Sequence, residues 1–203
     1  MPEEVAGGPA LDEQGVTISP RRRPHSPKSL RRALIEWCLI VVVAVIVSFG
    51  VRTFAVQTFV IPSKSMKPTL RVGDRILVDK LSVDFGTINI GDIIVFKAPP
   101  AEHCEVTKIT DLVKRVIGLP GDHLTSKGNT IYVNGKALKE KWTHFEPLGN
   151  QIGNVVVPKN TYFMMGDNHA NSCDSRTWGT VPRSDIIGKA FLRVWPPLRV
   201  GFL

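Results

Sequence analysis

The segment DLVKRVIGLPGD, residues 111–122, places a lysine inside an alternating apolar pattern that is typical of a β-strand. Alternate side chains of a strand point to the same face, so Lys114 is expected beside Leu112 and Val116. An amine between those side chains would be desolvated. Arg115 is expected on the opposite face, paired with a carboxylate. A lysine in a strand is more often an exposed edge residue, so this segment alone does not identify a function.

Other short segments around this strand are also rich in β-branched and aromatic residues and are bounded by Gly, Pro, Asn or Asp. The predicted strands cover residues 74–80, 91–97, 112–118, 155–166 and 189–195. Asn134-Gly135 is typical of a type I′ turn, which predicts a hairpin between residues 130–133 and 136–138. No long helical pattern follows residue 60. The predicted fold is mainly β, an antiparallel sheet or partly closed barrel.

The N-terminal part has a different composition. Residues 1–32 form a tail without apolar periodicity that ends in a basic run, and we expect it to be disordered. Residues 33–54 are apolar apart from Glu36 and Arg52 near the ends, which is long enough for one transmembrane helix. A cleaved signal peptide and a buried core helix fit less well, because the run is long, apolar all round and lacks a small-residue cleavage site. The basic flank predicts a cytoplasmic N-terminus, with residues 55–203 across the membrane.

Charge and cysteine content restrict the partners. The 203 residues carry a formal net charge of +8, which favours an anionic membrane surface or nucleic acid as a neighbour. The basic residues of the C-terminal part are scattered, so we expect no nucleic-acid partner. The three cysteines, Cys38, Cys104 and Cys173, form no C-x-x-C pair and predict no zinc site. Whether Cys104 and Cys173 are bonded or free stays open at this level.

The segment IPSKSMKPTL, residues 61–70, contains two serines whose side chains share one face of an extended chain. A lysine activates serine only when its amine is neutral, and the ordinary pKa of lysine is about 10.4. Lys64 would point away from the serines, and Lys67 lies at a Pro turn in polar surroundings. Since burial lowers the pKa of an amine, Lys114 is the better candidate.

A third segment, MGDNHANSCDSRTWGTVP at residues 165–182, is dense in small polar groups directly after an apolar strand. Together with PSKSMKPTL, GDIIVF and KRVIGLPGD, in this order behind an apolar N-terminal run, it is similar to the type I signal peptidases. These are membrane-anchored Ser–Lys endopeptidases. The resemblance covers the chain from about residue 33 to its end.

The resemblance implies a role for each matching residue. Ser65 corresponds to the nucleophile and Lys114 to the neutral general base, and the Ser63 hydroxyl forms the oxyanion hole with the backbone N–H of Ser65. Ser172 orients the lysine amine. Asp174 and Arg176 form a supporting ion pair, and Asp167 and Asn168 hold the loop. No metal or cofactor is implied.

The family acts on secretory preproteins, which it cuts after small residues at positions −1 and −3. Apolar residues near the site are candidates for the substrate pocket, although each fits a purely core role equally well: Phe59, Ile61, Met66, Leu70, Leu112 and Val113. The chain departs from the family at His169 and Ala170, and we expect His169 to be solvated. The segment between the lysine motif and the last motif is short, which predicts a small hairpin extension at about residues 122–155.

The implied setting is a bacterial plasma membrane or a thylakoid membrane, in contact with lipid, with the protein acting as a monomer. Other enzyme classes fit less well, because the S-x-x-K with K-T-G set and G-x-S-x-G are absent from the sequence. A self-cleaving repressor-type domain would carry a DNA-binding element in place of the apolar run. A membrane-anchored binding module without activity is the non-enzymatic alternative.

Overall fold

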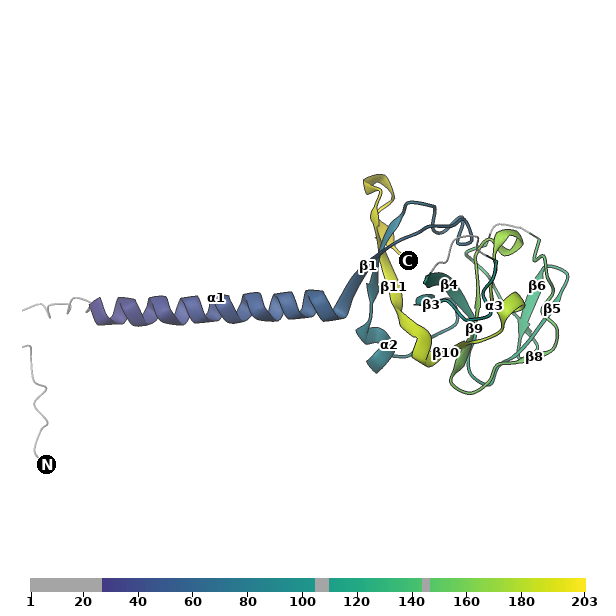
Figure 1. Ribbon diagram of the computed structural model, residues 1–203, viewed down its shortest axis with the longest axis horizontal. Helices are drawn as coiled ribbons and strands as arrows, with labels where there is room; N and C mark the ends of the chain where they lie inside the picture. Colours follow the sequence, from purple (N-terminus) through teal and green to yellow (C-terminus); the bar gives the residue numbers. More distant parts are fainter. Residues whose placement is uncertain (1–26, 105–109, 144–146) are drawn as a thin grey trace, which may run out of the picture. The chain divides into compact units, whose positions relative to one another are not determined.

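The computed structural model describes residues 27–104, 110–143 and 147–203 and consists mainly of antiparallel β structure (Figure 1). The chain divides into two compact units, residues 1–47 and 48–203. Most of the predicted N-terminal tail, residues 1–26, lies outside the described residues. The antiparallel β structure of the described residues confirms the antiparallel sheet fold that was predicted from the sequence.

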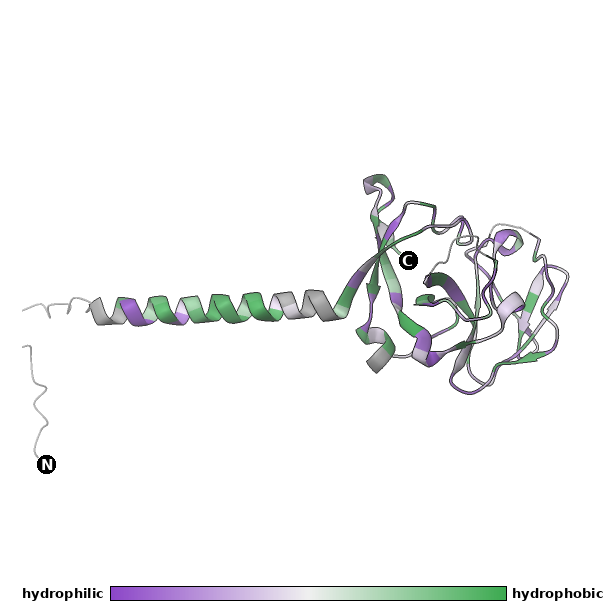
Figure 2. Cartoon of the chain, viewed as in Figure 1, coloured by the Kyte–Doolittle hydropathy of each residue, from purple (hydrophilic) through white to green (hydrophobic). Residues whose placement is uncertain are grey.

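The N-terminal element is the helix α1 (Pro27–Ala55). Its large apolar side chains between residues 34 and 47 are between 51% and 67% exposed, and Figure 2 shows how hydrophobic residues follow one another along the helix. Across the described part of the chain, none of the helices combines the length and apolar character that a membrane crossing requires. The transmembrane helix predicted at residues 33–54 is therefore not confirmed.

The larger sheet has eight strands, and all their pairings are antiparallel. Its hydrogen-bonded order is β1 (Val56–Val60), β2 (Arg75–Asp79), β11 (Ile186–Trp195), β3 (Ile93–Lys97), β4 (Asp111–Gly118), β9 (Thr161–Met165) and β10 (Val181–Pro182), with β12 (Gly201–Phe202) paired to β11. The order begins at β1 and ends at β10, so hydrogen bonding among the described strands leaves the sheet open. The strand β1 was not predicted from the sequence.

The central strands are buried on both faces. Ile94 and Phe96 of β3 pack into one apolar cluster with Leu112 and Val116, while Ile93 and Val95 pack into a second with Met66. This double burial explains why β3 is a continuous apolar run rather than an alternating one. It also surrounds the strand that carries Lys114 with packed side chains.

A smaller sheet has the strand order β7 (Lys136–Ala137), β6 (Thr130–Val133), β5 (His123–Lys127) and β8 (Val155–Val156). The predicted Asn134-Gly135 hairpin is confirmed: Val133 pairs with Lys136, and both turn residues have positive φ, at 52° and 76°. Leu148 and Ile152 pack in the cluster between this sheet and β9.

The single strand predicted at residues 155–166 is wrong, because these residues form two strands in different sheets. Pro158 interrupts the run, since its nitrogen has no hydrogen to donate to a neighbouring strand. Asn160 then adopts a positive φ of 58° in the turn that leads into β9. Short helical turns complete the fold: α2 (Leu81–Phe85), α3 (Ser175–Trp178), η1 (His169–Asn171), η2 (Arg183–Asp185) and η3 (Pro197–Arg199).

Candidate functional site

Ser65 lies in a compact turn between β1 and β2. The Leu70 amide donates to the Met66 carbonyl at 2.8 Å, and both of these side chains are buried in the core. The apolar residues that follow Ser65 therefore hold the turn against the sheet. Ser65 itself is only 6% exposed.

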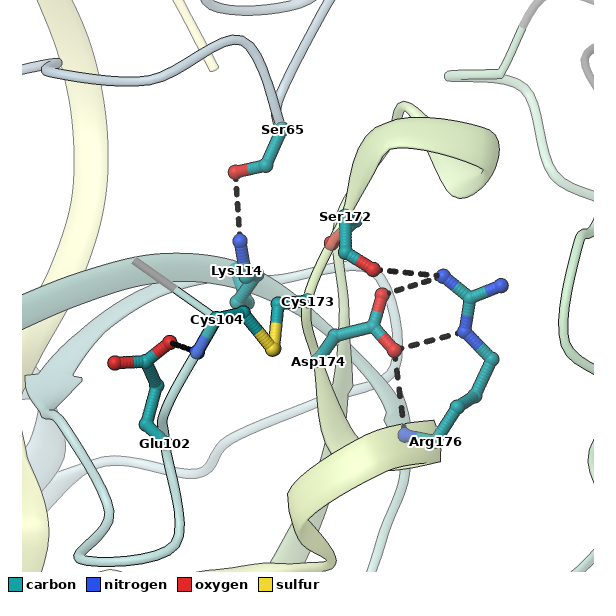
Figure 3. The surroundings of a disulfide bond; sticks show 8 residues. All are labelled: Ser65, Glu102, Cys104, Lys114, Ser172, Cys173, Asp174 and Arg176. Atoms are coloured by element: carbon teal, nitrogen blue, oxygen red, sulfur yellow. Dashed lines mark hydrogen bonds and ion pairs between the residues drawn. A yellow bond between two sulfur atoms is a disulfide. The ribbon is translucent and has the colours of Figure 1, made fainter. Parts of the chain in front are cut away.

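Lys114 reaches Ser65 from the central strand β4. Its Nζ donates to the Ser65 Oγ at 2.6 Å, although the two residues are 49 positions apart in the sequence (Figure 3). Lys114 is 4% exposed, and its predicted neighbours on the strand face, Leu112 and Val116, are buried as well. The structure thus brings together the two residues that the sequence predicted as nucleophile and base.

The other serine and the two lysines of residues 61–70 fall into two sets, as the sequence predicted: the serine lies beside Ser65 and the lysines are exposed. The Ser63 Oγ lies 3.2 Å from the Ser65 Oγ, so both hydroxyls face the same site. Lys64 and Lys67 are exposed to solvent. Neither of these lysines therefore shares the burial of Lys114, which is 4% exposed.

The loop after β9 is hydrogen-bonded directly to this turn. The Asn168 amide donates to the Ser65 carbonyl at 2.9 Å, and the Asn168 side chain donates to the Lys64 carbonyl at 3.3 Å. Gly166 leaves no room for a side chain: a Cβ there would lie 2.4 Å from the Ser65 carbonyl oxygen and 2.3 Å from the Ser172 Oγ. The loop and the serine turn therefore pack backbone to backbone.

Ser172 is the polar group without a partner at this contact. Its Oγ is buried and makes no hydrogen bond with any other group that the structure describes. The bond from Ser172 to the lysine amine is thus still a prediction. A buried hydroxyl without a partner is energetically unfavourable, which makes this side chain a candidate for a contact made during the reaction.

Asp174 and Arg176 form the predicted ion pair, with a distance of 2.7 Å between Arg176 Nη2 and Asp174 Oδ2 (Figure 3). Asp174 is completely buried and also accepts from the Gly166 amide at 3.2 Å. The Arg176 guanidinium donates to the carbonyls of His169, at 2.8 Å, and Leu148. This pair therefore fixes the loop and links it to the connection between β7 and β8, which contains Leu148.

A second buried ion pair lies on the opposite face of β4. Arg115 donates to Asp167 through Nε at 2.8 Å and through Nη2 at 2.7 Å, which confirms that Arg115 has a carboxylate partner. The Thr69 hydroxyl donates to the same carboxylate at 2.5 Å, and the Trp142 ring lies 4.6 Å from the guanidinium. Sequence reasoning missed Thr69 and Trp142, since neither belongs to a pattern that specifies its contacts.

The C-terminal residues hold the end of the serine segment from another side. Arg193 donates to the Thr69 carbonyl at 2.6 Å, and Arg199 forms two bonds of 2.8 Å with the buried Asp74. Burial, followed by the nearby Arg199 charge, lowers the pKa of Arg193 from its ordinary value. The strand β11 and the turn η3 at the C-terminal end of the chain thus both contact the residues around this turn.

A small cavity of about 10 Å³ adjoins the two serines. Four of the predicted pocket residues line this cavity, namely Ile61, Met66, Leu112 and Val113. Pro62, Asp111 and the polar residues of the site complete the lining. Phe59 and Leu70 are not among the lining residues. Leu70 is 0% exposed and fills the core, which is the alternative role considered from the sequence.

The expectation of a solvated His169 is wrong. Its side chain is buried, and its Nε2 lies 3.3 Å from the Glu140 Oε1 of the segment after β7. Glu140 of the connection between β7 and β8 thus lies against this part of the loop, which the local polar sequence did not indicate.

Cys104 and Cys173 are joined in a disulfide, which resolves the alternative left open by the sequence. Their ligand atoms and a Glu102 oxygen lie within 4.8 Å of one another, the only such group of potential metal ligands in the described ranges. Bonded sulfurs are not thiolates, and the thiolate is the form of cysteine that binds metals. We therefore assign no metal to this group.

Comparison with known proteins gives consistent matches. A family model described as signal peptidase, peptidase S26, matches residues 34–195. A probable signal peptidase I-2 of Synechocystis sp. is 42% identical over 80% of this chain and 73% of its own length. A signal peptidase I of Leptolyngbya laminosa is 40% identical over 95% of this chain and 97% of its own. The crystal structure of a signal peptidase I from Enterococcus faecalis V583 aligns with 51% of this chain and 96% of that one, at 28% identity and a TM-score of 0.40.

The buried ion pair on β4 leads to a stability prediction. Asp167→Asn leaves the buried Arg115 charge without its carboxylate, so we expect the free energy of unfolding to fall by about 3–5 kcal/mol in urea titrations. The double variant Arg115→Met/Asp167→Leu removes both charges and is expected to recover much of that loss. A loss below about 1 kcal/mol for Asp167→Asn, the value of an exposed pair, would contradict the prediction.

Proposed function

Because this chain belongs to the signal peptidase family, peptidase S26, we propose that it removes N-terminal signal peptides from exported preproteins through a Ser65–Lys114 pair. The observation that carries the mechanism is the buried contact of 2.6 Å between Lys114 Nζ and Ser65 Oγ. A serine hydroxyl is a weak nucleophile unless a neighbouring base takes its proton. Lys114 is the amine in contact with this hydroxyl.

The base must be uncharged before substrate arrives. Lys114 lies between the buried side chains of Leu112 and Val116 on its strand face. Removal from water disfavours the charged form of an amine, and a preprotein in the cleft would exclude more water. The neutral amine then accepts the Ser65 proton as the serine oxygen bonds to the carbonyl carbon of the scissile peptide.

The negative charge that develops on the carbonyl oxygen needs donors. The Ser63 hydroxyl is within 3.2 Å of the Ser65 Oγ, next to the position where that oxygen would form. With the Ser65 N–H it supplies two donors, each typically worth a few kcal/mol of transition-state stabilisation.

The remaining steps return the base to its starting state. Protonated Lys114 gives its proton to the leaving amine as the peptide C–N bond breaks, and the signal peptide stays esterified to Ser65. Neutral Lys114 then takes a proton from water as the water oxygen attacks the ester carbonyl. When the acyl–Oγ bond breaks, protonated Lys114 returns this proton to the Ser65 oxygen, and the signal peptide leaves as a carboxylic acid that ionises in water. Ser172 is proposed to turn its unpaired hydroxyl toward the amine, while Asp174 and Arg176 hold the loop that carries it.

The cavity beside the serines supports a preference for small residues at positions −1 and −3. Its apolar lining comes from Ile61, Met66, Leu112 and Val113, and its volume of about 10 Å³ leaves little room. Long side chains would have to displace packed neighbours, which is costly in a well-packed site.

Membrane attachment through residues 33–54 is part of the proposal. The apolar run continues past the side chains that the structure describes in α1, and those described are exposed. Water solvates such a surface poorly, and the basic residues before it favour a cytoplasmic N-terminus. Enzyme and preprotein would then share one plane, at a bacterial plasma membrane or a thylakoid membrane. Neither a nucleic acid nor a second copy of the chain is required.

Removal of either partner of the pair is expected to stop turnover. Against a model preprotein, Ser65→Ala should lower kcat by about 10⁶-fold and Lys114→Met by about 10²–10⁴-fold, as measured by gel or mass spectrometry. The control is Lys64→Met, which removes an exposed lysine of the same turn and should retain activity. Equal cleavage by wild type and Ser65→Ala would end the assignment.

Substrate size tests the pocket. A preprotein with Leu in place of Ala at −1 should lose at least about 10²-fold in kcat/KM. Val113→Ala enlarges the cavity and should restore part of the cleavage, whereas Val72→Ala, an exposed residue outside the lining, should not. Equal rates for both substrates with the wild-type enzyme would refute the assignment of this cavity to the −1 and −3 residues.

Membrane attachment is tested by carbonate extraction of cells that express the full chain. We expect the protein to stay in the membrane pellet. The variant Val42→Arg/Val43→Arg should be released, since each central arginine costs about 2.5–3.5 kcal/mol of insertion free energy. Release of the wild type into the carbonate supernatant would contradict the anchor.

A further inference from the structure

The disulfide connects two segments that each lead along the chain to a residue of the candidate site. Cys104 belongs to the connection between β3 and β4, which continues into the strand that carries Lys114. Cys173 lies between Ser172 and Asp174, in the loop after β9. The two Cα atoms are 6.2 Å apart across a separation of 69 residues, and Figure 3 draws the bond together with Ser172, Asp174 and the Ser65–Lys114 contact.

The Cys173 end of the bond adjoins the least constrained group of the site. Asp174 on one side is fixed by the Arg176 ion pair and the Gly166 amide. Ser172 on the other side has a buried Oγ without a partner among the described groups. The Ser172 hydroxyl and the Ser65 carbonyl both lie within 2.5 Å of the position that a Gly166 Cβ would occupy. A small shift of the chain at Cys173 therefore moves Ser172 relative to Ser65.

The Cys104–Cys173 disulfide is accessible to solvent, whereas the Ser65–Lys114 pair is not. Cys104 is exposed and Cys173 is partly exposed, whereas Ser65 and Lys114 are both buried. A dissolved thiol can thus reach the disulfide without entering the cleft. The third cysteine, Cys38, lies in α1 and takes no part in this bond.

We propose that the Cys104–Cys173 disulfide is a redox-sensitive positioning element, which holds the Ser172 loop against the strand of Lys114 and supports turnover only when oxidised. This inference rests on the proposed Ser65–Lys114 function. Cys104 and Cys173 act through Ser172 and touch no reacting atom.

The redox step balances with a small dithiol as the co-reactant. A thiolate of the dithiol attacks one sulfur of the disulfide and forms a mixed disulfide, and its second thiolate then displaces the protein sulfur. Two electrons and two protons pass to Cys104 and Cys173, which become thiols. The dithiol leaves as its own cyclic disulfide. An oxidant of the disulfide class reverses the exchange.

The effect is expected on turnover more than on substrate binding. The cavity is lined by residues of the serine turn and of β4, which are held by the β3–β4 pairing and by the core. Those contacts do not involve the disulfide. Displacement of a positioning group by about 1 Å costs up to 10²-fold in rate, so we expect kcat to fall by about tenfold or more while KM changes little.

The experiment compares the oxidised and dithiothreitol-reduced full-length protein on the model preprotein, with thiols counted by mass spectrometry. EDTA is present, because Glu102 and the two released thiols would form a group of possible metal ligands. The kcat of the wild type should fall on reduction and recover on reoxidation. The pH dependence of kcat should also differ between the oxidised and the reduced protein. Cys104→Ser/Cys173→Ser should have the low kcat in both buffers, and Cys38→Ser should behave as wild type.

Unfolding curves in urea show whether each sample is folded at the assay temperature. A fully reduced, folded wild type with unchanged kcat would overturn the proposal, and so would a double variant that still responds to dithiothreitol. A loss of stability without a change in kcat or its pH dependence assigns the bond a purely structural role and also overturns it. If oxidised wild type does not cleave the preprotein, it is the proposed function that fails.

Discussion

The contact on which the site depends is the one between an amine and a hydroxyl inside a packed sheet. Removal from water disfavours the charged form of any amine, and Lys114 is only 4% exposed among buried apolar side chains. The fold supplies this environment by burying β3 and β4 on both faces, so that Lys114 leaves the strand among Leu112 and Val116 rather than at an exposed edge. The Ser65 turn then closes over the amine.

Burying charged and polar groups around Lys114 costs free energy, and several polar contacts around the site offset this cost. Arg115, the neighbour of Lys114, is neutralised on the other face by Asp167, which also accepts from Thr69 at the end of the serine turn. Asp174 and Arg176 secure the loop on the remaining side. Every one of these charged groups is paired, as buried charges in proteins generally must be. Rigidity of this kind suits a site that must hold two small groups at hydrogen-bond distance.

Described residues of the connection between β7 and β8 contact both buried ion pairs. The Leu148 carbonyl accepts from Arg176, Glu140 lies beside His169, and the Trp142 ring lies on Arg115. This connection therefore supports both the loop and the strand of the site.

The antiparallel β class, the Asn134-Gly135 hairpin, the family and the carboxylate partnership of Arg115 could be inferred from the amino-acid sequence, because each follows from local alternation, turn chemistry or ordered motifs. The tertiary structure alone decided the contact of 2.6 Å between Lys114 and Ser65, the pairing of Cys104 with Cys173, the burial of His169 and the division of residues 155–166 between two sheets. These features join segments tens of residues apart. Their geometry is set by strand register and core packing, which no local pattern encodes.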